Sequence, residues 1–357
     1  MKIFITGGAG FLGLHLALHF SKKKYSVTLV DIADFEKSEY PKSCILINGD
    51  VRNASLMNKS LKNVDVVIHA AAALPLWKKE DVYDININGT KTMLEASIIN
   101  KVKRFVYISS TAVYGVPKVH PLFEGSKLIG VGAYGESKIS AEKICNEYRA
   151  KGMVISIIRP KTFVGTNRLG VFEILFDWIR DGKQIPVIGN GRNRYQLLDV
   201  DDLVEAIDRI SKIKNMKLAD TIFNMGSLHF ETVERDLQKL FDYAYNHRNI
   251  LDQNIKKARL LRTPAAPIKL ALRIFEKLKL SPLYEWVYDT ADKDSFVSID
   301  RLINTLKWKP KYSNSQALIK SYQWYLENYQ EIKSRPEGVT HRVGWKQGIL
   351  GFFKRFL

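Results

Sequence analysis

A phenol and an ammonium stand four residues apart at Tyr134 and Lys138, at the start of a helix predicted over 136–151. Residues at this spacing share one face of a helix, so the two side chains would lie together. A nearby ammonium stabilises phenolate and lowers the pKa of the tyrosine, which lets the phenol exchange a proton with a substrate hydroxyl. The same pair is also compatible with a solvent-exposed helix face. Other residues are therefore needed to distinguish a catalytic pair from an exposed one.

Two hydroxyl side chains precede this pair. Ser110 and Thr111 follow an apolar run, 105–109, that predicts a buried strand. Open α/β sheets bind their ligands at the carboxyl ends of the strands, so a binding site is expected here. Finding these hydroxyls and the Tyr–Lys pair together, in this order, favours a catalytic group over chance.

A glycine-rich turn lies between the first predicted strand and the first predicted helix. Its three glycines permit a tight turn, close approach of the backbone to a pyrophosphate, and tight packing of helix on strand. The helix N-terminus then offers unpaired N–H groups to phosphate. A turn without a ligand is the alternative, but its place between strand and helix favours a dinucleotide site. The residues expected to form it are Gly7, Gly10, Phe11, Leu12 and Gly13.

Acidic residues follow the next two predicted strands. Asp31, eighteen residues after Gly13, can accept hydrogen bonds from both ribose hydroxyls of adenosine and repel a 2′-phosphate. That favours NAD over NADP, although a turn residue is the alternative. Asp50, followed by Val51, either reaches the adenine edge or caps the helix that begins near Asn53.

The elements that must position these residues alternate between strand and helix. This alternation predicts right-handed crossovers and a doubly wound parallel sheet of the Rossmann type, covered on both faces. The predicted strands are 3–6, 27–30, 45–47, 66–69, 105–109 and 155–159. The predicted helices between them are 11–21, 53–61, 86–100 and 136–151.

The pattern changes after Arg159-Pro160. A helix is predicted over 171–181, a loop over 182–194, and strands over 197–200 and 221–224 that return to the main sheet with a helix between them. The rest is mostly helical. We therefore expect an NAD-binding domain formed by 1–165 and about 199–225, and a smaller, mostly helical substrate domain. The latter would take about 166–198 and 226–330, with a tail at 331–357.

Composition narrows the class of protein. The chain is 46% hydrophobic with 2 Cys, which excludes a disordered chain and a disulfide framework. No stretch is long and apolar enough to span a bilayer and no signal peptide is evident, so a cytoplasmic protein is expected. The net charge of +18 points to nucleic acid, an anionic small molecule or a membrane surface.

Over about residues 1–330 the sequence resembles the extended short-chain dehydrogenase/reductase superfamily, in its NAD-dependent epimerase/dehydratase group. The motifs that carry the resemblance are Thr6-Gly-Gly-Ala-Gly-Phe-Leu-Gly13, Asp31, Asp50, His69-Ala-Ala-Ala72, Asn86-Ile-Asn-Gly-Thr90, Ser109-Ser-Thr-Ala-Val-Tyr-Gly115, Tyr134-x-x-x-Lys138 and Arg159-Pro160.

The resemblance implies a role for each of these residues. Tyr134 would be the acid/base, Lys138 would lower its pKa and hold the nicotinamide ribose, and Ser110 would hydrogen-bond the reacting oxygen. Small side chains at Ala70, Ala71 and Ala72, together with Asn86, would border the NAD cleft. A homodimer through 86–100 and 136–151 is also implied.

The implied reaction is removal of hydride from a carbinol by NAD⁺ while Tyr134 takes the proton. An epimerase returns the hydride to the other face, whereas a dehydrogenase releases the ketone. Dehydratases of the group usually carry an Asp-Glu pair where this chain has Thr111 and Ala112, so dehydration is disfavoured.

The substrate is less well defined. Thr162, beside Lys161, stands where sugar-nucleotide members usually have Asn, and either Arg192 or Arg194 would hold a phosphate unless both lie in a solvated loop. A nucleotide-linked or lipid-linked sugar ranks first, and Thr111 and Thr162 are expected to contact it. The alternatives are a hydroxysteroid-dehydrogenase-like oxidoreductase acting on a hydrophobic alcohol, and a non-catalytic NAD-binding subunit.

Two basic amphipathic segments remain. Segment 265–280 is expected to pack on neighbouring helices, while the aromatic-rich 345–357 is a candidate anchor on an anionic membrane surface or a segment that docks on protein. An anchor of this kind would place the enzyme peripherally on the inner face of the membrane. Nucleic acid is not expected as a partner, because no nucleic-acid-binding module is evident.

Overall fold

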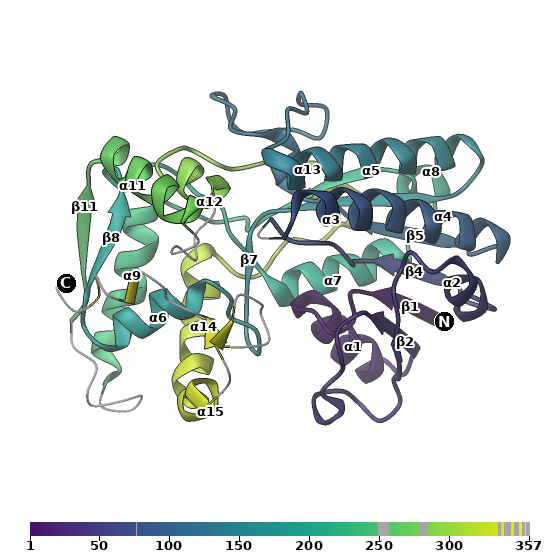
Figure 1. Ribbon diagram of the computed structural model, residues 1–357, viewed down its shortest axis with the longest axis horizontal. Coiled ribbons are helices and arrows are strands. Elements are labelled where there is room, and N and C mark those ends of the chain that lie inside the picture. The colour runs from purple at the N-terminus through teal and green to yellow at the C-terminus, as the bar shows by residue number, and fades with distance from the viewer. Residues whose placement is uncertain are drawn as a thin grey trace.

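A wholly parallel sheet of seven strands organises one half of the molecule, on the right in Figure 1. The computed structural model describes residues 1–75, 77–248, 257–278 and 285–334, with 337–338, 344–345, 350–351 and 354. In spatial order the strands are β3 (Ile45–Asn48), β2 (Ser26–Asp31), β1 (Lys2–Thr6), β4 (Val66–His69), β5 (Arg104–Ile108), β6 (Ile155–Pro160) and β10 (Ile222–Met225).

Helices cover both faces of this sheet. On one face, α1 (Phe11–Lys22) and α7 (Val200–Ser211) bury apolar side chains against β1, β2 and β5. On the other, α2 (Ala54–Ser60), α4 (Thr90–Ile99) and α5 (Gly132–Ala150) do the same. The strands are apolar on both sides, as a sheet covered on two faces requires. The predicted doubly wound Rossmann-type fold is confirmed.

A second lobe, on the left in Figure 1, has its own apolar core. Its helices are α6 (Phe172–Arg180), α9 (Val233–Asn246), α11 (Ala265–Lys277), α12 (Glu285–Thr290), α14 (Asn314–Glu327) and α15 (Tyr329–Ser334). A capping box between Ser313 and Gln316 fixes the start of α14. Helix α13 (Asp300–Leu306), inside the range expected for the second domain, instead contacts β10 and α7.

Two details differ from the sequence-based expectations. The predicted strand 197–200 is only β9 (Leu198–Asp199), which pairs with β7 (Phe163–Val164) and does not enter the main sheet. The predicted loop 182–194 contains β8 (Gln184–Ile188), which pairs with β11 (Arg259–Thr263). The Gly, Asn and Arg residues that predict a loop lie mostly after β8, at 189–194. Pro186 is tolerated within β8 because this strand has a partner on one side only.

The described part of the C-terminal tail touches the second lobe. Leu350 packs on the core of that lobe, and the Lys354 ammonium lies 2.5 Å from Asp177 and 2.7 Å from Asp181, both at the end of α6. Most of the predicted anchor segment 345–357 lies outside the described residues. No helix of the described residues combines the length and apolar character that crossing a bilayer requires.

A buried ion pair joins the two elements that flank the carboxyl end of β5. The Arg159 guanidinium donates to Glu142 at 2.9 and 2.5 Å, and both side chains are about 2% exposed. Arg159 also donates to the Tyr114 hydroxyl at 2.8 Å, and Ser109 donates to Glu142 at 2.5 Å. The pair therefore ties β6 and α5 to the segment that carries Ser110.

Removing one partner of this pair should destabilise the fold strongly. Glu142→Leu would leave the buried Arg159 cation without its counter-charge, and we expect the free energy of unfolding to fall by about 3–5 kcal/mol in urea titrations. The control is Glu231→Leu, which removes an exposed partner of Lys239 and should leave the free energy of unfolding nearly unchanged, because exposed ion pairs contribute little. Equal effects of the two substitutions would contradict this account.

Candidate active site

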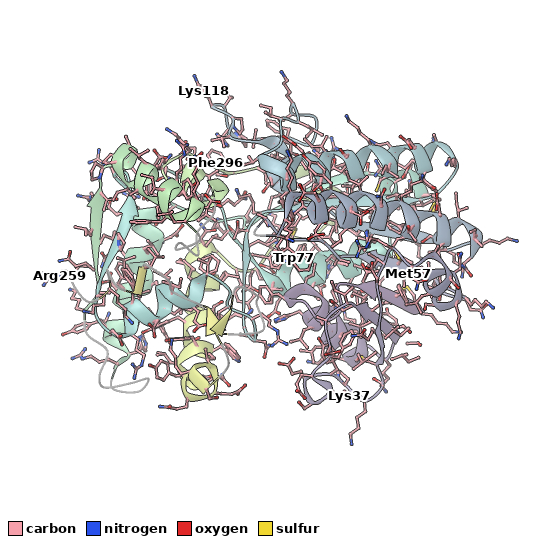
Figure 2. All side chains as sticks on the ribbon, in the orientation of Figure 1. Lys37, Met57, Trp77, Lys118, Arg259 and Phe296 are labelled. Atoms are coloured by element: carbon pink, nitrogen blue, oxygen red, sulfur yellow. The ribbon has the colours of Figure 1, made fainter. Side chains whose placement is uncertain are left out.

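One cavity of about 790 Å³ opens between the sheet and the second lobe. On the sheet side it is lined by residues that follow β1, β2, β4, β5 and β6, all at the carboxyl edge. On the other side it is lined by residues around α6, α11 and α12, including Phe172, Glu276 and Val287. Trp77, which also borders it, lies near the junction of the two lobes in Figure 2.

The glycine-rich turn forms one end of this cavity, through Gly7, Gly10, Phe11 and Leu12. Gly7 has φ +70°, and a Cβ there would lie 2.8 Å from the backbone nitrogen of Ala71. A Cβ at Gly13 would lie 2.3 Å from the carbonyl oxygen of Gly7. Gly13 does not line the cavity but allows α1 to approach the turn. The N-terminus of α1 is thereby directed at the place where a pyrophosphate would lie.

The acidic residues expected at the adenosine end lie beside this turn. Asp31 accepts hydrogen bonds from the backbone N–H groups of Ala9, at 3.0 Å, and Ala33, at 2.9 Å. Asp50 is paired with Arg52, and these hydrogen bonds hold the pKa of the Asp50 carboxyl below its usual value. Asp31, Asp50 and Val51 all line the cavity.

The alanine segment after β4 forms the floor of the cavity. The Thr6 hydroxyl accepts hydrogen bonds from the N–H groups of Ala70, at 3.1 Å, and Ala71, at 3.0 Å. Ala70, Ala71 and Ala72 line the cavity. Asn86 does not line it; its side chain accepts from Ala73 at 2.8 Å and donates to Ser137 at 2.9 Å. Asn86 thus ties the floor to α5.

The three catalytic candidates meet at the centre of the cavity. Tyr134 and Lys138 project from α5, Ser110 caps the short helix η3 (Thr111–Tyr114), and all three line the cavity. The hydroxyl of Ser110 is close enough to that of Tyr134 to affect its ionisation. The Lys138 ammonium donates to the carbonyl oxygen of Ile108 at 2.9 Å and lies 5.8 Å from the centre of the Tyr134 ring.

The pKa values of Tyr134 and Lys138 are not shifted as expected for a pair in which the ammonium lowers the pKa of the phenol. Burial raises the pKa of Tyr134 to about 12, and the hydrogen bond with Ser110 opposes that shift. Burial also lowers the pKa of Lys138 to about 8. The ammonium is directed at a backbone carbonyl and not at the phenol, so desolvation dominates both groups.

The residues expected to contact the substrate are not all brought to the cavity. Thr162 lines it, with its hydroxyl 3.3 Å from that of Tyr195. Thr111 donates to the carbonyl oxygen of Pro160 at 3.3 Å and does not line it. Arg192 and Arg194 are exposed and do not line it either. The Arg194 guanidinium lies over the rings of Phe230, at 4.7 Å, and Phe296, at 4.6 Å.

Sequence reasoning gave no role to several residues that border the substrate side of the cavity. Lys161, Phe172 and Glu276 are among them. Lys161 was recognisable as the residue directly after Arg159-Pro160, where a strand ends at the ligand-binding edge. Phe172 and Glu276 come from the second lobe, and nothing in their local sequence indicates that they face the cavity.

The cavity, the glycine-rich turn and the sheet together define a dinucleotide-binding enzyme of the Rossmann type. The model of the NAD-dependent epimerase/dehydratase family matches residues 3–226. The chain belongs to this family, which confirms the resemblance to extended short-chain dehydrogenases/reductases. It is an enzyme and its cofactor is NAD.

Similar proteins include sugar epimerases. A UDP-glucose 4-epimerase of Lactobacillus helveticus is 27% identical over 96% of this chain and 100% of its own length. An N-acetyl-α-D-glucosaminyl-diphospho-ditrans,octacis-undecaprenol 4-epimerase of Escherichia coli O157:H7 is 30% identical over 62% of this chain and 66% of its own. The UDP-glucose 4-epimerase of Thermotoga maritima, solved with UDP-glucose, has the same fold, with TM-score 0.73, 21% identity and coverage of 92% and 100%.

The position of Asp31 leads to a prediction about cofactor choice. If Asp31 has the role expected of it, Asp31→Ala should weaken NAD binding roughly tenfold and reduce the ratio of NAD affinity to NADP affinity. The substitution removes the carboxylate expected to accept from the ribose and to repel a 2′-phosphate. Calorimetric titration with both cofactors measures this. Asp65→Ala, at the opposite end of β1, is the matched control. An unchanged NAD/NADP ratio in Asp31→Ala would contradict the assignment.

Proposed function

We propose that the protein is an NAD-dependent epimerase that inverts a carbinol of a sugar carried on a diphosphate, linked either to a nucleotide or to a lipid. The observation that carries the proposal is the convergence of Tyr134, Ser110 and Lys138 on the cavity that also contains the glycine-rich turn. Relatives that act on UDP-sugars and on a polyprenyl-linked sugar support the substrate class.

Three side chains at the centre of the cavity would have separate roles in the reaction. Bound NAD supplies the acceptor, and then the donor, of the hydride. Tyr134, as the phenolate, would take the proton of the reacting hydroxyl and, as the phenol, later return it, while the Ser110 hydroxyl holds the same oxygen. The positive charges of bound NAD⁺ and Lys138 would favour the phenolate against the effect of burial. Lys138, fixed on the Ile108 carbonyl oxygen at 2.9 Å, would offer its remaining N–H groups to the cofactor ribose.

The other candidate reactions fit the cavity less well. Ala112, which lines the cavity, and Thr111 have no carboxyl group, so neither can remove the proton that eliminating water requires. A purely NAD-binding subunit would have no need of Ser110, Tyr134 and Lys138 together in the cavity lining. A hydroxysteroid-type oxidoreductase remains the enzyme alternative, and retention of NAD through purification would favour the epimerase.

An exposed apolar face beside the cavity favours a lipid-linked substrate. Leu270, Ile274 and Leu278, spaced by four along and just after α11, are 60%, 50% and 60% exposed. Lys277 lies on the same exposed side, whereas Glu276, on the inner side, lines the cavity. A helix with this arrangement can lie in the surface of an anionic membrane with the cavity next to the lipid.

A membrane-binding role for α11 changes what was expected of the two basic segments, 265–280 and 345–357. Residues 279 and 280 of the predicted segment 265–280 lie outside the described residues. Helix α11 itself buries Leu272 and is held on its neighbours by the ion pairs Lys269–Asp292, of 2.5 Å, and Arg273–Asp289, of 3.0 Å. The contacts of Leu350 and Lys354 with the second lobe favour docking on protein for that part of the tail. Membrane association would therefore depend on α11 more than on 345–357.

A homodimer through α4 and α5 is part of the proposal. These two helices lie next to each other on one face of the sheet, and Ile99, at the end of α4, is 63% exposed. Because α11 belongs to the second lobe, a dimer of this kind would leave the exposed face of α11 accessible.

Loss of the phenol should stop the reaction. Tyr134→Phe should lower the epimerisation rate by roughly 10²–10⁴ with NAD binding retained, because the general acid/base is removed. Epimer formation is followed with UDP-sugars and polyprenyl-diphosphate sugars, and bound NAD is assayed separately. Tyr243→Phe, on α9, is the control and should retain full rate. Full activity in Tyr134→Phe would refute the mechanism.

Charged residues on the exposed face of α11 should abolish binding to anionic vesicles. Leu270→Asp with Ile274→Asp should reduce flotation with phosphatidylglycerol vesicles roughly tenfold or more, since two inserted side chains lose their burial. The control pair is Met216→Asp with Leu218→Asp, which are 48% and 45% exposed on α8 (Met216–Ala219). If deletion of 345–357 abolishes flotation while the α11 variant still floats, the tail is the anchor and the α11 proposal fails.

A further inference from the structure

One buried cation of the cavity has no part in the proton chemistry. Lys161 lines the cavity and is 2% exposed. Its backbone N–H donates to the carbonyl oxygen of Met225 at 2.8 Å, which fixes its place directly after β6. Its ammonium donates to the hydroxyl of Ser295 at 2.6 Å and lies 4.7 Å from the centre of the Tyr195 ring.

The partners of the Lys161 ammonium are neutral. Among the residues that the structure describes, no carboxylate lies within ion-pair distance of it. Burial alone accordingly lowers the pKa of Lys161 to about 7. A buried ammonium without a counter-charge is costly to the fold, which is why buried lysines are normally paired.

The register of the sheet places Lys161 close to the reacting groups. Ile108 of β5 pairs with Ile158 of β6, so the residues just beyond these strands lie beside each other. The hydrogen bond of 3.3 Å from Thr111 to Pro160 continues this alignment. Continued beyond the strands, this register places Lys161 level with Thr111, the residue after Ser110.

Among the described residues, the cavity has one other buried cation, Lys138, whose ammonium already donates to a backbone carbonyl. Its lysines are Lys79, Lys138 and Lys161, and it has no arginine. Lys79 is exposed, and Lys138 donates to Ile108. Arg194, expected from the sequence to hold an anion, lies instead over the rings of Phe230 and Phe296.

We propose that Lys161 is the anion-binding residue of the substrate site and forms an ion pair with an oxyanion of the substrate. That oxyanion is either a diphosphate oxygen or a carboxylate on the sugar itself. Ser295 and the Tyr195 ring would hold the ammonium in place, the hydroxyl as an acceptor and the ring through a cation–π contact. The source of the oxyanion rests on the substrate class given under the proposed function. The assignment of Lys161 as an anion-binding residue does not.

The test compares Lys161→Met, which keeps the length of the side chain and removes its charge, with wild type. Both proteins are loaded with NAD and also carry Tyr134→Phe, so that binding is measured without turnover; in this comparison, wild type refers to residue 161 only. The ligands are inorganic pyrophosphate, UDP-glucose and UDP-glucuronate, each titrated calorimetrically. Lys217→Met, an exposed lysine on α8, is the matched control and should bind every ligand as wild type does.

The expected result is a loss of affinity of about 10- to 100-fold, the usual effect of removing a charged hydrogen-bond partner. Loss for all three ligands would identify the diphosphate as the source of the oxyanion. Loss for UDP-glucuronate alone would identify the sugar carboxylate. The assignment is overturned if the variant binds every ligand as tightly as wild type, or if wild type binds none at millimolar concentration. A different outcome would refute the proposed function and leave the assignment of Lys161 intact. In it, protein that retains Tyr134 binds these ligands through Lys161 but does not epimerise the sugars.

A second readout needs no ligand. With its pKa lowered to about 7 from 10.5, folded Lys161 has lost a proton that the unfolded chain still binds between these pH values. The free energy of unfolding should therefore rise with pH over this range in wild type, and rise less in Lys161→Met. Tyr195 and His120, the titratable groups that face Lys161, are common to both proteins. Identical pH profiles would show that Lys161 is not held as an uncompensated cation.

Discussion

The buried ion pair between Arg159 and Glu142 is the interaction on which the geometry of the site depends. It joins β6 to α5 and, through Ser109, to the end of β5, so that Tyr134 and Ser110 come from elements locked to one another. A buried pair of this kind is costly to desolvate and is stable only when every donor and acceptor is satisfied. Tyr114 and the carbonyl oxygen of Glu124 complete that set.

Burial also governs the chemistry of the cavity. It raises the pKa of Tyr134 and lowers those of Lys138 and Lys161, in each case disfavouring the charged form. Proton abstraction by Tyr134 therefore requires the positive charges of bound NAD⁺ and Lys138 to favour its phenolate against the effect of burial. Among the described residues, three lysines and no arginine line the cavity. The +18 net charge of the chain is therefore only in small part a property of the active site.

The sequence was sufficient for the parts of the molecule whose signals are local. Apolar runs located the strands of the sheet, and the glycine turn located the dinucleotide end, because each depends on neighbouring residues. Non-local arrangements were not predictable: β8 and β11 lie some 70 residues apart in the chain, and the exposed stripe of α11 depends on which face its neighbours cover. Arg194 and Lys161 show the same limit, since composition cannot tell which cation folds into the cavity.

The central claim is that the sugar carbinol is oxidised transiently and receives the same hydrogen back on its other face. The direct test is to supply UDP-glucose, or a polyprenyl-diphosphate sugar, with deuterium at the reacting carbinol carbon and to analyse the product by mass spectrometry and NMR. Return of the same hydride should give an epimer that retains the deuterium, with no net reduction of NAD. Loss of the deuterium to solvent, or a ketone released with stoichiometric NADH, would contradict it.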